Sequence, residues 1–315
     1  MTASLHTENS GSLSDRLKML HRVRTYWIDG VLEQSLHGLA PLPLSIELLP
    51  QAVQYPMDAI LLRPDQSHKL LPTTTRIPAA FDQLGGSLLI LGEPGSGKTT
   101  LLLELAREFI LRAEADIHRP MPVVFSLVTW AQSRQALDAW LVQELTRRYQ
   151  IPITIGKRWV YGSQILPLLD GLDELSDEAA KAGIDQINAF HTKYGMVDIA
   201  VSCRTQTYER LQKRLEFSGA IAALPLTDAQ VKSCLEQMGQ PFKHLLRILK
   251  RDTSLRTRLR SPLWLNVAAR AFADEAGHDF AKRAQTSLDD NLLLHAYINR
   301  NVSMIVRQVG QEFRQ

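Results

Sequence analysis

A glycine-rich segment has the residue types and spacing best suited to binding phosphate. Residues 92–99 read Gly-Glu-Pro-Gly-Ser-Gly-Lys-Thr, which fits the pattern G-x-x-x-x-G-K-[ST]. Glycines let successive backbone N–H groups point inward around phosphates, and the positive end of a following helix dipole favours the same anion. We expect Lys98 to reach the β- and γ-phosphates of a nucleotide and the Thr99 hydroxyl to ligate magnesium. The predicted nucleotide-binding residues are Gly92, Gly95, Ser96, Gly97, Lys98, Thr99, Thr100.

The neighbours of this segment are those that the phosphate site requires. Residues 87–91 form a short apolar run that predicts a buried strand, and residues 99–115 have the apolar spacing of a helix. A chance match in an ordinary glycine-rich turn is the alternative. A strand directly before the segment and a helix directly after it favour the phosphate loop.

Three acidic residues follow a second apolar run. Residues 166–174 read Leu-Pro-Leu-Leu-Asp-Gly-Leu-Asp-Glu, and the acids in this segment are Asp170, Asp173 and Glu174. Asp170 is predicted at the carboxyl end of its strand, where a parallel sheet gathers its ligands, and we expect it to hold magnesium directly or through water. Asp173 and Glu174 could orient and deprotonate an attacking water. A polar loop that only caps the strand remains the alternative for one of these two.

An arginine ends a third apolar run. Arg204 and Thr205 follow the segment Asp-Ile-Ala-Val-Ser-Cys, which begins at residue 198. An arginine at this position can reach a γ-phosphate and report its presence. A surface ion pair is the alternative. We favour Arg204 as the sensor, because a charge just beyond a buried strand needs a partner.

The order of the apolar runs predicts an α/β fold. Helical patterns such as residues 99–115 and 137–149 alternate with short apolar runs, which implies right-handed crossovers and a parallel sheet covered by helices on both faces. The expected strands are residues 87–91, 123–127, 165–169, 198–203 and 220–226.

The segments on either side of this core predict the domain organisation. Residues 1–13 are rich in Ser, Thr and Gly and predict a disordered leader, whereas apolar residues spaced by three or four predict a helix from about Asp15 to Leu36. Seven prolines between residues 38 and 78 exclude long helices and favour an extended linker. The predicted divisions are a leader at 1–13, a helix and linker at 14–78, a P-loop domain at 79–227 and a helical domain at 228–315.

The helical domain begins at a capping-box pattern, Thr227 to Gln230, and a final helix is expected at residues 288–308. Its residues 246–260 contain six basic residues against one acid, Asp252. This could indicate a nucleic-acid contact, but a solvated helix face or a contact with a neighbouring copy is the interpretation that we favour. The basic residues are Arg247, Lys250, Arg251, Arg256, Arg258, Arg260.

Overall composition excludes several classes of protein. Thirty-six Lys and Arg against 33 Asp and Glu give a net charge of +3, which is too small to indicate nucleic acid or an anionic membrane. Two cysteines cannot build a disulfide framework or a four-cysteine zinc site. The first residues contain no apolar stretch like that of a signal peptide, and no window is apolar enough to span a membrane. We therefore expect a soluble cytoplasmic protein, or the soluble part of one.

Together these motifs resemble the NACHT group of the STAND class of signal-transduction P-loop NTPases, particularly bacterial members. The resemblance covers roughly Trp27 to Ile298 and depends on GEPGSGKTT and LPLLDGLDEL, which correspond to the Walker A and Walker B motifs, and on VSCRT. It implies ATP or ADP with Mg²⁺ as cofactors, slow and regulated hydrolysis, and self-association in the ATP state. Ser261-Pro-Leu-Trp resembles a helical-domain motif whose proline, here Pro262, touches the nucleotide base. The family's winged helix would begin near Gln315, so we expect a fragment or a closing element from elsewhere.

Other NTPase classes agree less well with the sequence. A GTPase would need an [NT]-K-x-D motif, and Thr192-Lys-Tyr-Gly lacks the Asp; a transporter ATPase would need L-S-G-G-Q, which is absent. A small-molecule kinase stays open, although paired acids after Asp170 suit water activation better. A scaffold that binds nucleotide with negligible turnover is the other alternative. The sequence does not identify an upstream sensor or a downstream effector.

Overall fold

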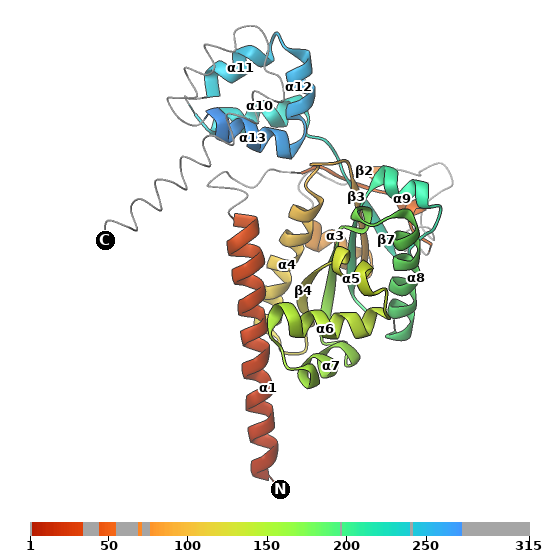
Figure 1. Cartoon of the computed structure of the whole chain (residues 1–315). Coiled ribbons are helices and arrows are strands. Elements are labelled where there is room, and N and C mark those ends of the chain that lie inside the picture. The colour runs from red at the N-terminus through yellow and green to blue at the C-terminus, as the bar shows by residue number, and fades with distance from the viewer. Residues whose placement is uncertain are drawn as a thin grey trace, which may run out of the picture. The chain divides into compact units, whose positions relative to one another are not determined.

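The computed structural model describes residues 2–33, 44–54, 69–70, 76–195, 197–239 and 242–272 (Figure 1). Contacts divide the chain into two compact units, Met1–Gly38 with Ile46–Leu224, and Leu39–Ser45 with Pro225–Gln315. The domain limits predicted from the sequence stay predictions. The expected final helix at residues 288–308 and the expected helix end at Leu36 lie outside the described residues.

The first unit is built on a mostly parallel sheet, as predicted. In the described part of the chain seven strands pair in the order β2-β1-β7-β3-β6-β5-β4. The five strands from β7 to β4 run parallel, whereas β1 is antiparallel to both of its neighbours. The strands are β1 (Ile46–Leu48), β2 (Lys69–Leu70), β3 (Ser87–Gly92), β4 (Met121–Ser126), β5 (Ile165–Asp170), β6 (Ile199–Arg204) and β7 (Gly219–Ala223).

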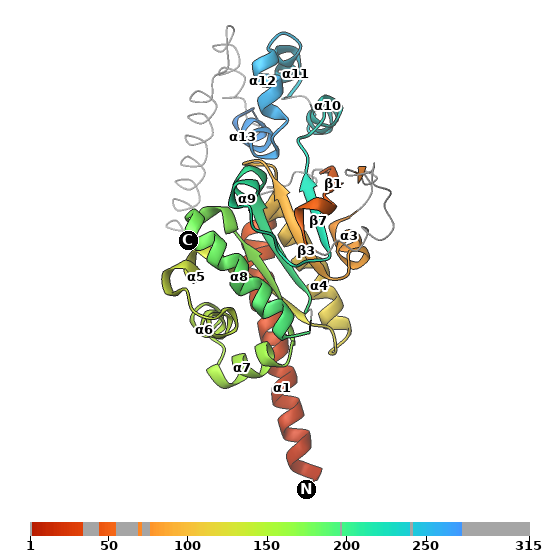
Figure 2. The ribbon, with the colours of Figure 1, turned by 90° about the vertical axis from the view of Figure 1, so that its right-hand side faces the viewer.

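The chain reverses its direction across the sheet after β4, and this reversal explains why helices cover both faces. From β3 the chain crosses to the far edge at β4, and it then returns through β5 and β6 to β7. Because crossovers between parallel strands are right-handed, connections made in opposite directions lie on opposite faces. Figure 2 shows α3 and α4 on one side of the sheet and α5, α6 and α8 on the other. The helices are α3 (Ile77–Gln83), α4 (Lys98–Ala115), α5 (Leu127–Ser133), α6 (Leu137–Tyr149), α7 (Ile153–Tyr161), η4 (Leu172–Glu174), α8 (Asp177–Lys193) and α9 (Thr205–Leu211).

The N-terminal helix differs from the sequence-based expectation. Helix α1 (Thr2–Val23) already begins in the segment predicted to be a disordered leader, and it continues as the π-helix η1 (Arg24–Glu33). Packing fixes the later part of this helix: Trp27 Nε1 donates to the Tyr149 hydroxyl at 2.8 Å, and that hydroxyl donates to the Val124 carbonyl at 2.6 Å. Adding residues to an existing helix costs far less than nucleating one, so a polar segment can extend it. The prediction for residues 1–13 was therefore wrong about their secondary structure.

The described parts of the proline-rich segment contribute to the sheet edge. Strand β1 pairs antiparallel with β7, and β2 pairs antiparallel with β1. The short 3-10 helix η2 (Pro50–Ala52) follows β1. The prediction of an extended linker stays a prediction. Pro78 lies in the first turn of α3, where its missing N–H costs nothing. The prolines outside the described residues are Pro41, Pro43, Pro56, Pro64 and Pro72.

The second unit is helical in its described part. Its helices are α10 (Asp228–Gln237), α11 (Lys243–Leu249), α12 (Thr253–Leu259) and α13 (Pro262–Phe272). The predicted capping box is confirmed: the Thr227 side chain accepts from the backbone of Gln230, and the Gln230 side chain accepts from the backbone of Thr227. Apolar side chains from all four helices form one core, with Leu235, Leu245 and Leu255 fully buried. Among the described residues, no helix is both long and apolar enough to cross a bilayer.

Candidate functional site

The glycine-rich loop connects β3 to α4, where the sequence predicted it. Gly95 and Gly97 have φ values of 73° and 94°, which side chains with a Cβ rarely adopt. Gly97 is the residue before the first turn of α4, so the free N–H groups at the start of this helix face the loop. At Gly92 a Cβ atom would lie 2.4 Å from Ser96 Oγ. Glycine at these three positions therefore lets the loop close tightly on itself.

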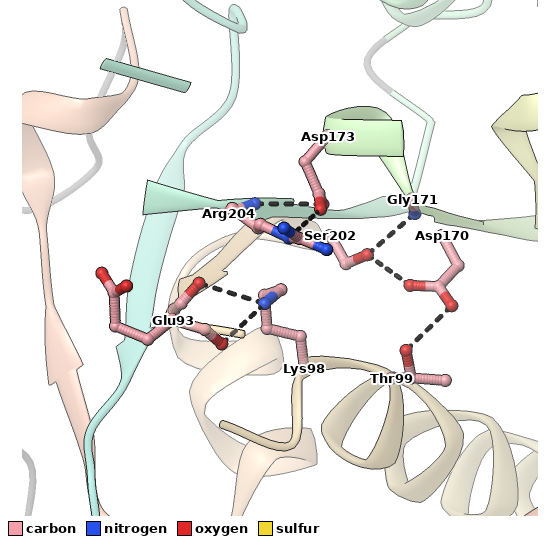
Figure 3. A network of polar contacts seen from close by, with 9 residues as sticks. Glu93, Lys98, Thr99, Asp170, Gly171, Asp173, Ser202 and Arg204 are labelled. Atoms are coloured by element: carbon pink, nitrogen blue, oxygen red, sulfur yellow. Dashed lines mark hydrogen bonds and ion pairs between the residues drawn. The ribbon is translucent and has the colours of Figure 1, made fainter. Parts of the chain in front are cut away.

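The Lys98 ammonium lies within the loop. Its Nζ donates to the carbonyl oxygens of Gly92 and Glu93, at 3.0 Å each (Figure 3). Burial lowers the pKa of Lys98, and Arg204 acts in the same direction, whereas the carboxylate of Asp173 opposes them. A cation held among carbonyls at a helix N-terminus is well placed to receive a polyphosphate.

Ser96 supplies an observation that fits a phosphate in this loop. Its residue is 3% exposed, and its Oγ is a buried polar atom with no hydrogen-bond partner among the described residues. A buried hydroxyl without a partner is costly and uncommon in folded proteins. A phosphate oxygen is an acceptor that this hydroxyl can reach from within the loop, so the residues present fit a nucleotide.

Thr99 and Asp170 come together across the site. Thr99 Oγ1 at the start of α4 donates to Asp170 Oδ2 at the end of β5, over 2.9 Å (Figure 3). The described residues contain no group of three or more His, Cys, Asp or Glu side chains that could hold a metal ion by itself. Mg²⁺ in such sites is bound by one or two protein oxygens together with substrate phosphates and water. The pair fits a magnesium ion bound with a nucleotide.

Ser202 is a site residue that the sequence reasoning missed. Its side chain on β6 donates to Asp170 Oδ1 and accepts the backbone N–H of Gly171 at 3.1 Å. Ser202 is 1% exposed. The Ser202 hydroxyl bonds both to the Asp170 carboxylate and to the backbone N–H of Gly171. It therefore fixes the orientation of the carboxylate that faces Thr99. The sequence gives one usable signal, a polar residue inside an otherwise apolar strand.

Asp173 and Arg204 form a close ion pair. Arg204 Nε lies 2.7 Å from Asp173 Oδ2, and the Arg204 backbone N–H donates to Oδ1 of the same carboxylate at 3.1 Å. The Asp173 side chain is 6% exposed, whereas that of Arg204 is 50% exposed. The arginine therefore has the partner that the sequence argument required. That partner is one of the two acids predicted as a candidate base.

Glu174 is the acid of this group whose carboxylate has no partner in the described part of the chain. It has no side-chain hydrogen bond or ion pair with any other described residue. Burial raises the pKa of Glu174, with further increases from Asp170 and Asp173, and Arg204 opposes them. A carboxylate with a raised pKa and no partner is suited to accept a proton from water. The geometry therefore favours Glu174 over Asp173 as the base.

Two predicted residues are placed without a test of their roles. Thr100 is the third residue of α4, and its side chain is partly exposed. Pro262 is the first residue of α13 in the second unit. Its expected contact with the nucleotide base stays a prediction.

The comparison with protein families agrees with this geometry. The family model for the NACHT domain matches residues 87–241, which contain the loop, the three acids and Arg204. Residues 87–241 form a NACHT domain. A NACHT domain is a nucleotide-binding domain of the P-loop NTPase fold.

The curated relatives match over limited lengths. NLR family CARD domain-containing protein 4 of Xenopus tropicalis is 27% identical over 225 residues, which are 67% of this chain and 21% of that protein. The chain thus spans about a fifth of the length of this relative. An ATP-dependent helicase/nuclease of Alkaliphilus metalliredigens is 35% identical over 75 residues, 24% of this chain and 6% of that protein.

Solved structures resemble the NACHT chain distantly. The Aeropyrum pernix ORC1 protein in complex with DNA has 14% identity and a TM-score of 0.48, covering 80% of this chain and 72% of that one. AMPPCP-bound DnaA from Aquifex aeolicus has 14% identity and a TM-score of 0.35, covering 78% and 91%. At these scores the similarity does not indicate what this chain binds.

Proposed function

We propose that the NACHT domain binds Mg-ATP, hydrolyses it slowly to ADP, and couples its nucleotide state to conformational change or self-association in signalling or defence. The observation that carries the proposal is the 2.9 Å contact between Thr99 Oγ1 and Asp170 Oδ2, beside a phosphate loop with Lys98 inside it. Two oxygens from α4 and β5 thus converge next to a cation that can bind the β- and γ-phosphates.

Each residue has a distinct task in this proposal. Lys98 and the loop amides would bind the phosphates, and Thr99 and Asp170 would hold a magnesium ion, which would supply positive charge beside the phosphate oxygens. Ser202 keeps the Asp170 carboxylate directed at Thr99. Glu174 takes a proton from the attacking water. These side chains come from α4, from the carboxyl end of β5 and the short helix η4 that follows it, and from β6.

The ion pair of Arg204 supports the slow and switch-like character of the reaction. The guanidinium of Arg204 is paired with the carboxylate of Asp173. To contact a γ-phosphate, the guanidinium would have to leave this carboxylate and pair with the phosphate instead. Such an exchange links the presence of a γ-phosphate to the position of the turn that carries Asp173, because both the side chain and the backbone of Arg204 bond to this acid.

The experiment that tests the proposal is calorimetry of the full chain with Mg-ATP, Mg-ADP and Mg-GTP, and with the Lys98→Ala variant. We expect binding of Mg-ATP by the wild type, weakened by about a hundredfold or more in the variant, because a buried charge-assisted contact is lost. Molecular mass measured with ADP and with a non-hydrolysable ATP analogue tests the coupling to self-association. Absence of any binding heat, or equal ATP affinity in the variant, would contradict the proposal.

A scaffold that binds nucleotide with negligible turnover is the second candidate. The observation that favours it is the same Asp173–Arg204 pair, which engages both a candidate base and the candidate sensor. Single-turnover hydrolysis separates the two functions. Conversion of bound ATP to ADP that is lost in Glu174→Gln supports the enzyme, whereas nucleotide that stays intact in the wild type supports the scaffold.

A further inference from the structure

The second unit has a pocket of its own, formed by one face of α10 together with α11, the residue after it and α12. Its volume is about 630 Å³. On α10 the lining residues recur every three or four positions from Asp228 to Glu236, and on α11 they recur likewise from Lys243 to Lys250. Two helices that each present one face to the same space form a groove between helices. We call it the α10–α11 groove, lined by Asp228, Val231, Lys232, Glu236, Lys243, Leu246, Arg247, Leu249, Lys250 and Arg256.

The floor of the groove is apolar. It is formed by Val231, Leu246 and Leu249, which also belong to, or pack against, the core of the second unit. Val231 and Leu249 are 2% and 8% exposed, and Leu246 is partly exposed. The side chains that line this floor are thus anchored by the core beneath them.

The rim of the groove has an excess of positive charge. Five basic and two acidic side chains line it. Lys232 is paired with Glu236 at 3.7 Å, and Arg256 Nε donates to the Leu249 carbonyl at 3.2 Å. The remaining basic side chains, Lys243, Arg247 and Lys250, are exposed and have no ion pair with any other described residue. Within the described part of the chain, three cations without an ionic partner therefore stand beside an apolar floor.

This combination discriminates between classes of partner. No described aromatic side chain lines the groove, so this part of the surface lacks the rings on which nucleic-acid bases stack. Backbone phosphates need cations but have no use for an apolar floor. A helix with leucine-type residues on one face and acids beside them matches both the floor and the rim, in the way that amphipathic helices bind grooves.

We propose that the α10–α11 groove binds an acidic amphipathic helix of a partner protein. Apolar side chains of that helix pack on Val231, Leu246 and Leu249, and its flanking carboxylates pair with Lys243, Arg247 and Lys250. Binding requires no residue of the nucleotide site, so this surface is a further site, separate in function from the phosphate loop.

The test uses a fluorescein-labelled synthetic helical peptide with Leu at positions i, i+3, i+4 and i+7 and Glu at the flanking positions, titrated with the full chain in fluorescence anisotropy. Three probes are compared with it: the same peptide with Lys for every Glu, a scrambled sequence of the same composition, and a duplex DNA. We expect the acidic peptide to bind, with an affinity that falls as salt rises, and the Lys and scrambled peptides to bind at least about tenfold more weakly.

Matched variants locate the binding on the groove. The double variant Arg247→Glu with Lys250→Glu is compared with Arg251→Glu, a neighbouring exposed arginine that does not line the groove. Leu246→Ser is compared with Leu263→Ser, at a leucine that is 56% exposed and also outside the groove. We expect each groove variant to weaken the acidic peptide by about tenfold or more and each control to leave its affinity unchanged.

The outcomes decide the proposal in either direction. Leu246→Ser could destabilise the second unit, whereas the two charge reversals lie on exposed side chains. Circular dichroism checks that the double variant is folded, and the test then depends on that variant. Selective loss in the groove variants supports the proposal. No binding of the acidic peptide, equal binding of the Lys or scrambled peptide, or equal loss in Arg251→Glu overturns it. Tighter binding of the duplex DNA that is lost in the double variant also overturns it and assigns the surface to nucleic acid.

Discussion

Substitution of Ser202 by alanine tests how the magnesium-binding carboxylate is oriented. The change removes a hydroxyl that donates to Asp170 Oδ1 and accepts the N–H of Gly171. A hydrogen bond to a charged group contributes about 1.5–3 kcal/mol and a neutral one about 0.5–1.5 kcal/mol. Both bonds are lost at a residue that is 1% exposed, so water cannot readily replace them. We expect the free energy of unfolding to fall by about 2–4 kcal/mol.

The same substitution should weaken magnesium binding in a way that stability alone does not explain. Loss of the partner that orients a metal-binding carboxylate typically lowers metal affinity by about 10–100-fold. Ser87→Ala is a matched control, because Ser87 is also 1% exposed on a neighbouring strand. Its Oγ bonds to Ser218 Oγ at 2.6 Å and accepts the Ser218 N–H at 2.9 Å, with no link to Asp170.

The assay is urea unfolding of each variant, together with nucleotide affinity measured as a function of Mg²⁺ concentration. We expect both alanine variants to lose stability, and only Ser202→Ala to need more magnesium for half-maximal ATP binding. If Ser202→Ala and Ser87→Ala share the magnesium dependence of the wild type, the idea that Ser202 orients Asp170 is refuted.

Three further substitutions test the acids and the arginine. Glu174→Gln should bind Mg-ATP but lose about 10²–10⁴-fold in hydrolysis rate, as measured by single turnover; full turnover would move the base to Asp173. In the wild type the hydrolysis rate should fall as the pH is lowered through the raised pKa of Glu174, since the protonated acid cannot accept a proton. The raised pKa of Glu174 contributes to the stability of the fold below the unfolded pKa of this residue, and this contribution is lost as the pH rises through the folded pKa. At neutral pH the ionised carboxylate therefore destabilises the fold, and the uncharged Glu174→Gln variant should melt at a higher temperature than the wild type. Arg204→Ala should reduce the preference for ATP over ADP, whereas Asp173→Asn, which frees the arginine, should increase it; unchanged ATP-to-ADP affinity ratios in both would exclude Arg204 as the sensor.

Local patterns in the sequence predicted the elements of the central sheet well. The expected run at residues 87–91 differs from β3 by one residue, and the expected helix at 137–149 has the bounds of α6. These elements are buried on at least one face, so their apolar spacing carries a strong signal. The N-terminal helix was less predictable, because the sequence of its first turns is rich in Ser and Thr and contains few apolar residues.

Contacts between distant residues could not be predicted in the same way. The sequence could not distinguish Asp173 from Glu174, which are adjacent in the chain. They differ in the fold, because Arg204 at the end of β6 pairs with Asp173 and leaves Glu174 without a partner in the described residues. Pairing depends on which strand lies beside which, and strand order is a property of the whole sheet.

The sequence by itself determined the phosphate loop, the acid at the end of β5 and the α/β class of the first unit, because backbone freedom, helix polarity and apolar periodicity are local properties. Only the tertiary structure decided that Ser202 bonds to Asp170 and that three cations, unpaired among the described residues, border an apolar groove on α10 and α11. The physical reason is that orientation, burial and charge pairing arise between residues far apart in the chain, whose separation is fixed only when the strands and helices pack.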